Sequence, residues 1–183
     1  RRSSDLDIDL TLCIDTSLNN NTILISLVYY NLTNVILNIL SSFSQIYKTS
    51  QNFISYINQK NSKGYNALLY SAFRGNLEIF KKLMELGANI NETNSSGLNA
   101  LHLAVQGNHP NIIVYLIEKC GFDINSKDIN GSNALHWGIN MNSRQAVDYL
   151  VYYNIDINTK DKDGETALGI AHNKANQYFI KKF

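Results

Sequence analysis

The sequence predicts an all-α fold, a solenoid of stacked helix-turn-helix units joined by β-turn or hairpin loops. The first observation is a segment of the form Gly-x-Asn/Thr-Ala-Leu, which begins at Gly64, Gly97, Gly131 and Gly164, at spacings of 33, 34 and 33 residues. The second is an Ile-Asn pair that ends six residues before each of those glycines, at Asn58, Asn91, Asn125 and Asn158. Internal repeats of about this length are typical of stacked solenoids.

Two short helices are expected in each unit. Small and apolar residues after each Gly-x-Asn/Thr-Ala-Leu segment predict a first helix, as in residues 101–105 and 135–139. A second helix follows a short break, with apolar residues at helical spacing at Leu77, Phe80, Leu83 and Met84 in one unit and at Ile112, Ile113, Leu116 and Ile117 in the next. We expect Gly87 and Gly121 to end second helices, where a positive φ is needed. Since neither helix can bury its apolar face alone, each pair must pack on its neighbours.

These units resemble the ankyrin repeat, whose Thr-Pro-Leu-His-x-Ala signature is echoed in residues 99–104, Asn-Ala-Leu-His-Leu-Ala. The resemblance covers roughly residues 20–183 and is strongest over 57–170. The signature proline is Ala at 67, 100, 134 and 167, and the threonine is Asn at 66, 99 and 133, where Asn can still cap the helix. The signature histidine is Leu69 in the first clear unit and Gly169 in the last. We therefore expect these two units to be less regular than the middle pair.

The domain organisation follows from this register. Residues 1–21 are expected to form an amino-terminal arm or the remnant of a preceding repeat. A degenerate first repeat is predicted over 22–57, because Thr22 and Asn31 take the places of Asn66 and Gly75, and it carries an insertion of about eleven residues at about 41–53. Three repeats follow over 58–91, 92–125 and 126–158, and residues 159–183 are expected to be a truncated carboxyl-terminal capping repeat. The missing initiator Met and the end at Phe183 indicate either a shortened cap or a piece of a longer chain.

Composition argues against several classes of function. The formal net charge of +1 gives no reason to expect nucleic-acid binding, and we interpret Lys81-Lys82 as the solvated face of a helix. The apolar stretch 23–40 is interrupted by polar residues, so no membrane span is expected. Cys13 and Cys120 have no metal-ligand spacing, and no cleavable leader is visible. These features favour a reducing compartment, cytoplasmic or alternatively nuclear.

Candidate chemistry is sparse. The carboxylates of Asp5, Asp7 and Asp9 would share one face of a strand and could bind Mg²⁺, and the run superficially resembles the aspartate motif of haloacid-dehalogenase enzymes. It lacks a glycine-rich phosphate loop and a second acidic cluster in a recognisable order, so we interpret it as a solvated arm or a turn. The resemblance implies that His102 and His136 bond neighbouring backbone across the stack. We therefore predict that the chain is not an enzyme and holds no metal and no cofactor.

The resemblance implies a protein-protein interaction module, which binds its partner on a concave face built from hairpin tips and the exposed side of the first helices. The partner-binding candidates at the tips are Lys63, Tyr65, Ser96, Leu98, Asn130, Ser132, Asp163 and Glu165, and those at the helix ends are Phe73, Arg74, Gln106 and Met141. Tyr65, Phe73, Arg74, Leu98 and Met141 are expected to anchor the partner, because exposed apolar side chains on a recognition face usually have a use. Trp137, in contrast, is expected to be mostly buried between repeats, where the family places a packed leucine.

Two alternatives of another class stay open. The chain could be a regulatory or substrate-docking segment of a larger enzyme. It could instead be an architectural domain that associates with another copy through the insertion at 41–53 or through the open carboxyl-terminal repeat. The principal expectation is a monomer that binds another protein, whose identity the sequence does not give.

Overall fold

The computed structural model describes residues 14–15, 21–47 and 51–183. In this part of the chain two short strands are followed by eleven helices: β1 (Ile14–Asp15), β2 (Asn21–Thr22), α1 (Ile23–Tyr29), α2 (Thr33–Tyr47), α3 (Gln51–Asn58), α4 (Ala67–Arg74), α5 (Leu77–Glu85), α6 (Ala100–Gln106), α7 (Pro110–Cys120), α8 (Ala134–Asn140), α9 (Arg144–Tyr152), α10 (Ala167–Asn173) and α11 (Gln177–Ile180). The strands pair antiparallel, with Ile14 opposite Thr22. The predicted all-α solenoid is confirmed, although the boundaries assigned to the repeats stay a prediction.

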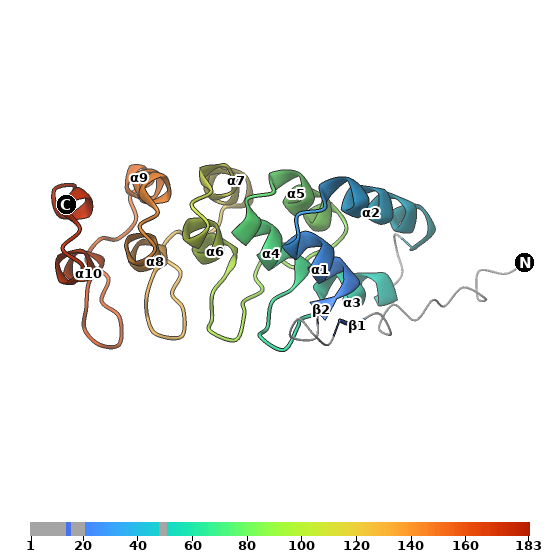
Figure 1. Ribbon diagram of the computed structural model, residues 1–183, viewed down its shortest axis with the longest axis horizontal. Helices are drawn as coiled ribbons and strands as arrows, with labels where there is room; N and C mark the ends of the chain where they lie inside the picture. Colours follow the sequence, from blue (N-terminus) through green and yellow to red (C-terminus); the bar gives the residue numbers. More distant parts are fainter. Residues whose placement is uncertain (1–13, 16–20, 48–50) are drawn as a thin grey trace, which may run out of the picture.

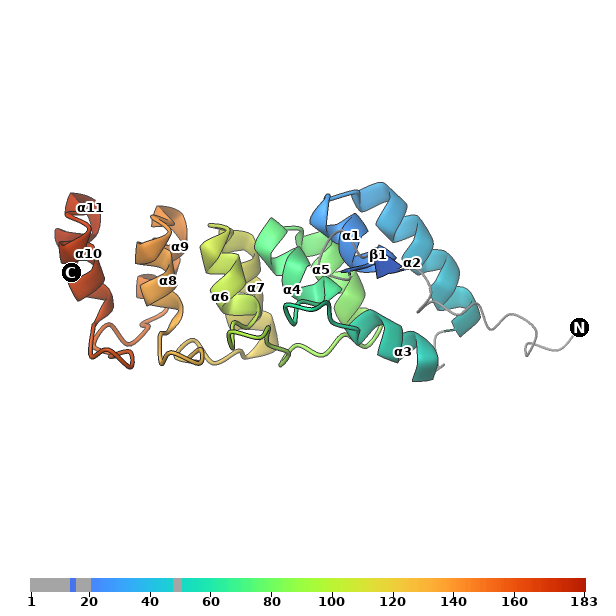
Figure 2. The ribbon, with the colours of Figure 1, turned by 60° about the horizontal axis from the view of Figure 1, so that its bottom comes forward.

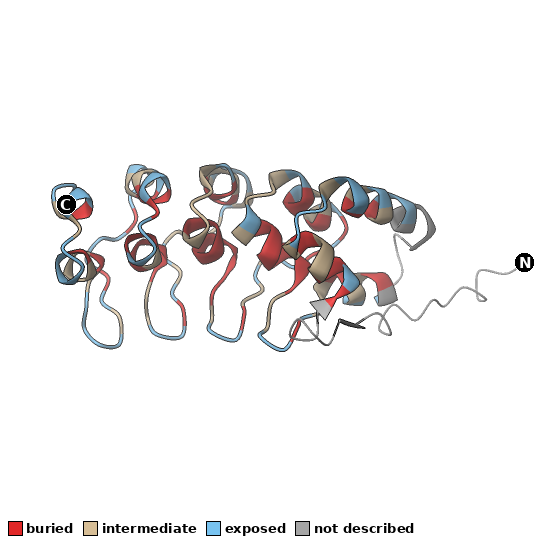
Figure 3. Ribbon diagram, viewed as in Figure 1, coloured by how far each residue is buried: buried red, intermediate tan, exposed pale blue. Residues whose placement is uncertain are grey.

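The helices lie in two rows (Figure 1). The inner row is α1, α4, α6, α8 and α10, and the outer row is α2, α5, α7, α9 and α11. Buried residues are concentrated on the inner helices and on the sides of the outer helices that face them, whereas the loop tips are exposed (Figure 3). The core is therefore a continuous layer between the rows, as expected when each helix pair buries its apolar face on its neighbours.

Each inner helix begins at a polar cap. The side-chain oxygens of Asn66, Asn99 and Asn133 accept hydrogen bonds from the backbone N–H groups three residues further on, at distances of 2.9, 3.1 and 3.4 Å. Thr22 and Thr166 cap α1 and α10 in the same way, both at 3.2 Å. Exchanging the family's threonine for asparagine thus keeps the cap, because either side chain offers an oxygen to an N–H group that has no partner within the helix.

The two middle units are the more regular, as the sequence predicts. In α6 and α8 the signature histidine completes a capping box with its asparagine, and Nε2 of His102 and of His136 lies 3.3 and 3.2 Å from the backbone oxygens of Ser132 and Glu165 in the next hairpin. Leu69 and Gly169 stand at the corresponding positions of α4 and α10 and cannot make either bond. Each histidine therefore links its own helix cap to the following unit.

The hairpins between units share one turn geometry. Asn61, Asn94, Asp128 and Asp161 stand at the same position in successive hairpins, and Oδ1 of each accepts from the backbone N–H groups two and four residues further on, at 2.8 to 3.0 Å. Neighbouring hairpins are also joined through their backbones, by Ser95 N to Lys63 O, Ile129 N to Ser96 O and Lys162 N to Asn130 O. The tips therefore form one connected ledge along the stack.

The predicted insertion adds helix rather than an irregular loop. Helix α2 has 15 residues, whereas α5, the outer helix of the next unit, has nine. Helix α3 then lies beside the hairpins, apart from the two rows (Figure 2). Phe53 and Ile57 of α3 are buried in the common core, so this segment is an integral part of the fold.

The amino-terminal end of the stack exposes apolar side chains. Ile23 and Val35 are 44% and 46% exposed, whereas the residues in register with them in the last unit, Ala167 and Phe179, are 1% and 0% exposed. In the described part of the chain the last unit has a neighbour only on its amino-terminal side, so these two positions face the preceding unit. Ile23 and Val35 thus belong to a surface that every following unit buries.

Candidate partner-binding face

We define the hairpin face as the loop tips together with the exposed side of the inner helices. Of the predicted partner-binding residues, Lys63, Arg74, Ser96, Asn130, Met141, Asp163 and Glu165 are exposed, and Tyr65, Phe73, Gln106 and Ser132 are partly buried. Eleven of the twelve candidates therefore reach the surface of this face. Their role in binding stays a prediction.

Leu98 is the exception, and its assignment as an exposed anchor is wrong. Its side chain is 4% exposed and belongs to the hydrophobic core. Its backbone N–H donates to Oδ1 of Asn94 over 2.9 Å, and its backbone oxygen accepts from the N–H of Asn94 over 3.0 Å. The closed hairpin turns the leucine inward, where burying its apolar surface is favourable.

Two other predicted anchors also hold the fold together. The ring of Tyr65 stacks on that of Tyr70, with centroids 4.7 Å apart. Nε of Arg74 donates to the backbone oxygen of Tyr29 over 2.6 Å, and the guanidinium lies 4.9 Å from the centroid of the Tyr29 ring. Substitutions of Tyr65 and Arg74 would therefore disturb packing as well as the exposed face.

Trp137 is mostly buried and packs against the core, as expected, but it is not fully enclosed. Its indole Nε1 donates a hydrogen bond of 3.0 Å to Oδ2 of Asp128. At the same position of the preceding inner helix, Leu103 is fully buried. The larger indole extends beyond the core to the hairpin, where a carboxylate can accept from its N–H. Sequence reasoning missed this hydrogen bond because its acceptor, Asp128, lies in the hairpin loop, whereas Trp137 lies on helix α8.

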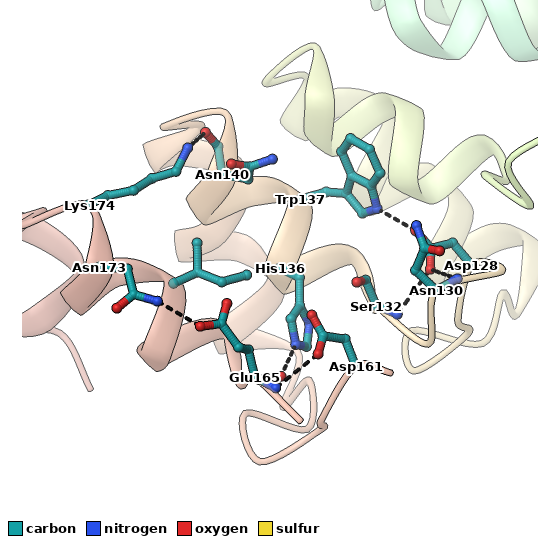
Figure 4. A pocket seen from close by; sticks show the side chains of 11 residues that line it. Asp128, Asn130, Ser132, His136, Trp137, Asn140, Asp161, Glu165, Asn173 and Lys174 are labelled. Atoms are coloured by element: carbon teal, nitrogen blue, oxygen red, sulfur yellow. Dashed lines mark hydrogen bonds between the residues drawn. The ribbon is translucent and has the colours of Figure 1, made fainter. Parts of the chain in front are cut away.

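Trp137 lines a cleft of about 400 Å³ between the third and fourth hairpins (Figure 4). The lining residues are Asp128, Asn130, Ser132, His136, Trp137, Asn140, Asp161, Glu165, Ile170, Asn173 and Lys174. The lining thus contains three carboxylates and one ammonium group, that of Lys174. Nζ of Lys174 donates to the backbone oxygen of Asn140 over 2.8 Å. Asn130, Ser132 and Glu165 are predicted site residues, whereas Trp137, Asp161 and Lys174 were not among those candidates.

The titratable groups near this face fit structural roles. Burial lowers the pKa of His102 to about 4, with Asp128 opposing the shift, so the ring is neutral at pH 7. Burial also lowers the pKa of His109, whose Nε2 lies 2.9 Å from the backbone oxygen of Phe73. Cys120 is a free thiol with a pKa that burial raises, which makes it a weaker nucleophile.

Across positions 14–15, 21–47 and 51–183, no three side chains among His, Cys, Asp and Glu gather so as to hold a metal ion. None of the helices described there has the length and apolar character to cross a membrane. Asp5, Asp7, Asp9 and Cys13 lie outside the described residues.

Fold and surface together define a repeat protein that presents a connected ledge of hairpin tips beside its inner helices. A family model described as ankyrin repeats (3 copies) matches residues 24–128 and, a second time, residues 87–161. The chain therefore belongs to the ankyrin repeat family. Ankyrin repeats are generally protein-protein interaction modules, and none of these findings shows a catalytic activity.

Curated proteins similar to this chain carry the same repeats. Over 66 residues, or 36% of this chain, it is 39% identical to the Notch-regulated ankyrin repeat-containing protein of Xenopus tropicalis and 41% identical to the protein of that name in Homo sapiens. It is 38% identical over 66 residues to Notch-regulated ankyrin repeat-containing protein A of Danio rerio. The chain spans 58 to 59% of the length of these relatives, so the likeness supports the repeat fold and carries no more than that.

Proposed function

We propose that this chain is a non-catalytic module that binds a protein partner on its hairpin face, the concave face of the family. The observation that carries the proposal is the backbone linkage of successive tips, by Ser95 to Lys63, Ile129 to Ser96 and Lys162 to Asn130. A surface fixed in this way loses little conformational entropy when a partner binds. The exposed side chains along the ledge are therefore available for recognition at low entropic cost.

The charge of the face also changes along the stack. Lys63 and Arg74 lie near its amino-terminal end, whereas its carboxyl-terminal end is mixed, with Asp161, Asp163 and Glu165 beside Lys162 and Lys174. Complementary charges mainly select the partner and fix its orientation. A partner with acidic groups opposite the first hairpin and groups of both signs opposite the last fits this arrangement.

A pair of substitutions tests the proposal once a partner has been isolated with the whole chain. Ser96→Arg places a long charged side chain in the middle of the hairpin face, and we expect it to weaken partner affinity by at least about tenfold while melting stays nearly unchanged. Gln145→Arg adds the same side chain to an exposed position of the outer helix α9 and should bind like wild type. Titration calorimetry measures the partner affinity of both variants. If Gln145→Arg binds the partner more weakly than Ser96→Arg does, the interface lies on the outer helices and the proposal is wrong.

A second candidate function is self-association through the amino-terminal end of the stack. It is favoured by the exposure of Ile23 and Val35 at positions that all following units bury. A second copy could cover the two side chains in the way that a preceding unit would. Light scattering of wild type and Val35→Lys tests this: a dimer that becomes a monomer in the variant supports it, and a wild-type monomer excludes it. The role of a docking segment within a larger enzyme would use the same hairpin face as the first candidate.

A further inference from the structure

The four hairpins differ in charge at a position where their geometry does not require it. Asn61 and Asn94 use only Oδ1 to accept the two backbone N–H groups of the turn, and Asp128 and Asp161 do the same with matching distances. An amide therefore serves the turn as well as a carboxylate. The negative charges of the third and fourth hairpins need another explanation.

For Asp128 the second oxygen has a partner within the chain, because Oδ2 accepts from the indole Nε1 of Trp137. In the next unit Ile170 takes the position of Trp137, and its side chain has no hydrogen to donate. Among the described residues, Oδ2 of Asp161 consequently has no hydrogen-bond donor. One carboxylate oxygen is thus left on the wall of the cleft described above.

A second carboxylate lies beside it. Glu165 uses Oε1 to accept from Nδ2 of Asn173 over 2.7 Å, which leaves Oε2 without a donor in the described part of the chain. Figure 4 shows Asp161 and Glu165 on one side of the cleft and Trp137 on another, and Ile170 adds a second apolar lining residue. Lys174, the ammonium group of the lining, already donates to a backbone oxygen.

We propose that this cleft binds an arginine side chain of the protein partner. The inference deepens the proposed function and rests on it. A guanidinium carries five N–H donors in a planar fork that matches carboxylate oxygens, and its flat face also packs on an indole. Oδ2 of Asp161 and Oε2 of Glu165 accept from the fork, and Trp137 and Ile170 contact the stem and the plane of the side chain. A lysine offers a point charge without the plane and fits the same lining less well.

The first test needs no natural partner. N-acetylarginine amide is titrated into the whole chain and followed by NMR through the indole Nε1–H of Trp137, the chain's only tryptophan, and the backbone amide of Glu165. Both signals should shift in a saturable way. N-acetylcitrulline amide, of nearly the same shape but uncharged, should shift them far less at equal concentration. Equal shifts with both compounds, or none with arginine, would overturn the proposal.

The matched variant is Asp161→Asn, which restores the residue that the first two hairpins already use and so keeps the turn. This variant should weaken the binding of N-acetylarginine amide by about tenfold, which is the loss expected for one charge-assisted hydrogen bond. Glu78→Gln removes the same charge from an exposed position of α5 and should leave the titration unchanged. If the two variants behave alike, binding depends on net charge and the cleft is not the site.

The outcomes separate this inference from the proposed function. Loss of partner binding in Ser96→Arg, combined with no arginine binding in the cleft, would leave the hairpin face as the interface and refute the arginine site. Saturable arginine binding that Asp161→Asn weakens, combined with full partner affinity in Ser96→Arg, would support the cleft as a guanidinium site and refute the proposed interface.

Discussion

The indole Nε1 of Trp137 donates to Oδ2 of Asp128 over 3.0 Å, while Oδ1 of the same carboxylate closes the third hairpin. Helix α8 and its hairpin are thereby joined through one side chain. The equivalent carboxylate of the fourth hairpin, Asp161, closes its own turn but has Ile170 where α8 has the indole. The two aspartates thus form a natural pair for measuring the indole bond.

We predict that Asp128→Asn destabilises the fold and that Asp161→Asn does not. The amide oxygen can still close the turn in either variant, but in Asp128→Asn the amide N–H₂ then faces the indole N–H, so two donors meet at a largely buried position. The expected loss is about 1–3 kcal/mol of unfolding free energy, against less than about 0.5 kcal/mol for Asp161→Asn. Urea unfolding measures both, and equal losses would show that the indole bond does not stabilise the fold.

The free energy of unfolding should decrease as the pH falls below about 6.5, because the fold holds His102 in its neutral form. Its pKa is lowered to about 4 in the folded chain, so between these two pH values the unfolded chain binds a proton that the folded chain does not. The stability that comes from neutral His102 is fully present above its pKa in the unfolded chain and is lost as the pH falls to its pKa in the folded chain. The total loss is on the order of 3 kcal/mol. Melting curves at pH 7.5 and 4.5 measure the loss.

His102→Leu is the control for this pH dependence. Leucine already stands at the equivalent position 69, where α4 is still capped by Asn66. The variant should be less stable than wild type at pH 7.5, because it lacks the bond to Ser132, and should lose less stability between the two pH values. A wild-type drop that His102→Leu reproduces in full would assign the effect to other groups.

The exposed end of the stack predicts a contrast between two apolar truncations. Val35→Ala should cost less than about 0.5 kcal/mol, because nearly half of the side chain is in water. Ile79→Ala, in register with Val35 one unit further on, removes a fully buried side chain and should cost about 2–5 kcal/mol. Chemical unfolding compares the two. A large loss in Val35→Ala would mean that another surface covers this end in solution.

Two hairpin glycines with nearly the same φ should respond differently to alanine. Gly97 and Gly164 have φ of +75° and +79°, a conformation that costs an L-residue about 1–2 kcal/mol. A Cβ on Gly97 would also stand 2.7 Å from the backbone nitrogen of Ile129, whereas one on Gly164 would meet nothing within 4 Å. Gly97→Ala should therefore be the more damaging in thermal unfolding. Equal melting temperatures would show that the hairpins can separate without cost.

Much of the fold follows from local sequence. The caps at Asn66, Asn99 and Asn133 and the positive φ of Gly87 and Gly121 involve residues only a few positions apart, so their patterns can be read directly. The repeat register also identified most of the exposed positions of the hairpin face, because equivalent residues of a solenoid occupy equivalent places.

Tertiary structure decided what each of those places contains. The sequence fixes that Leu98 is a tip residue, that Trp137 lies on an inner helix and that Val35 is in register with Ile79. Only the packing shows that Leu98 is buried, that Trp137 reaches a carboxylate of its hairpin, and that Val35 is exposed. The physical reason is that burial and hydrogen bonding at a given register position depend on the side chains of neighbouring loops and units, whose sizes and charges differ while the backbone repeats.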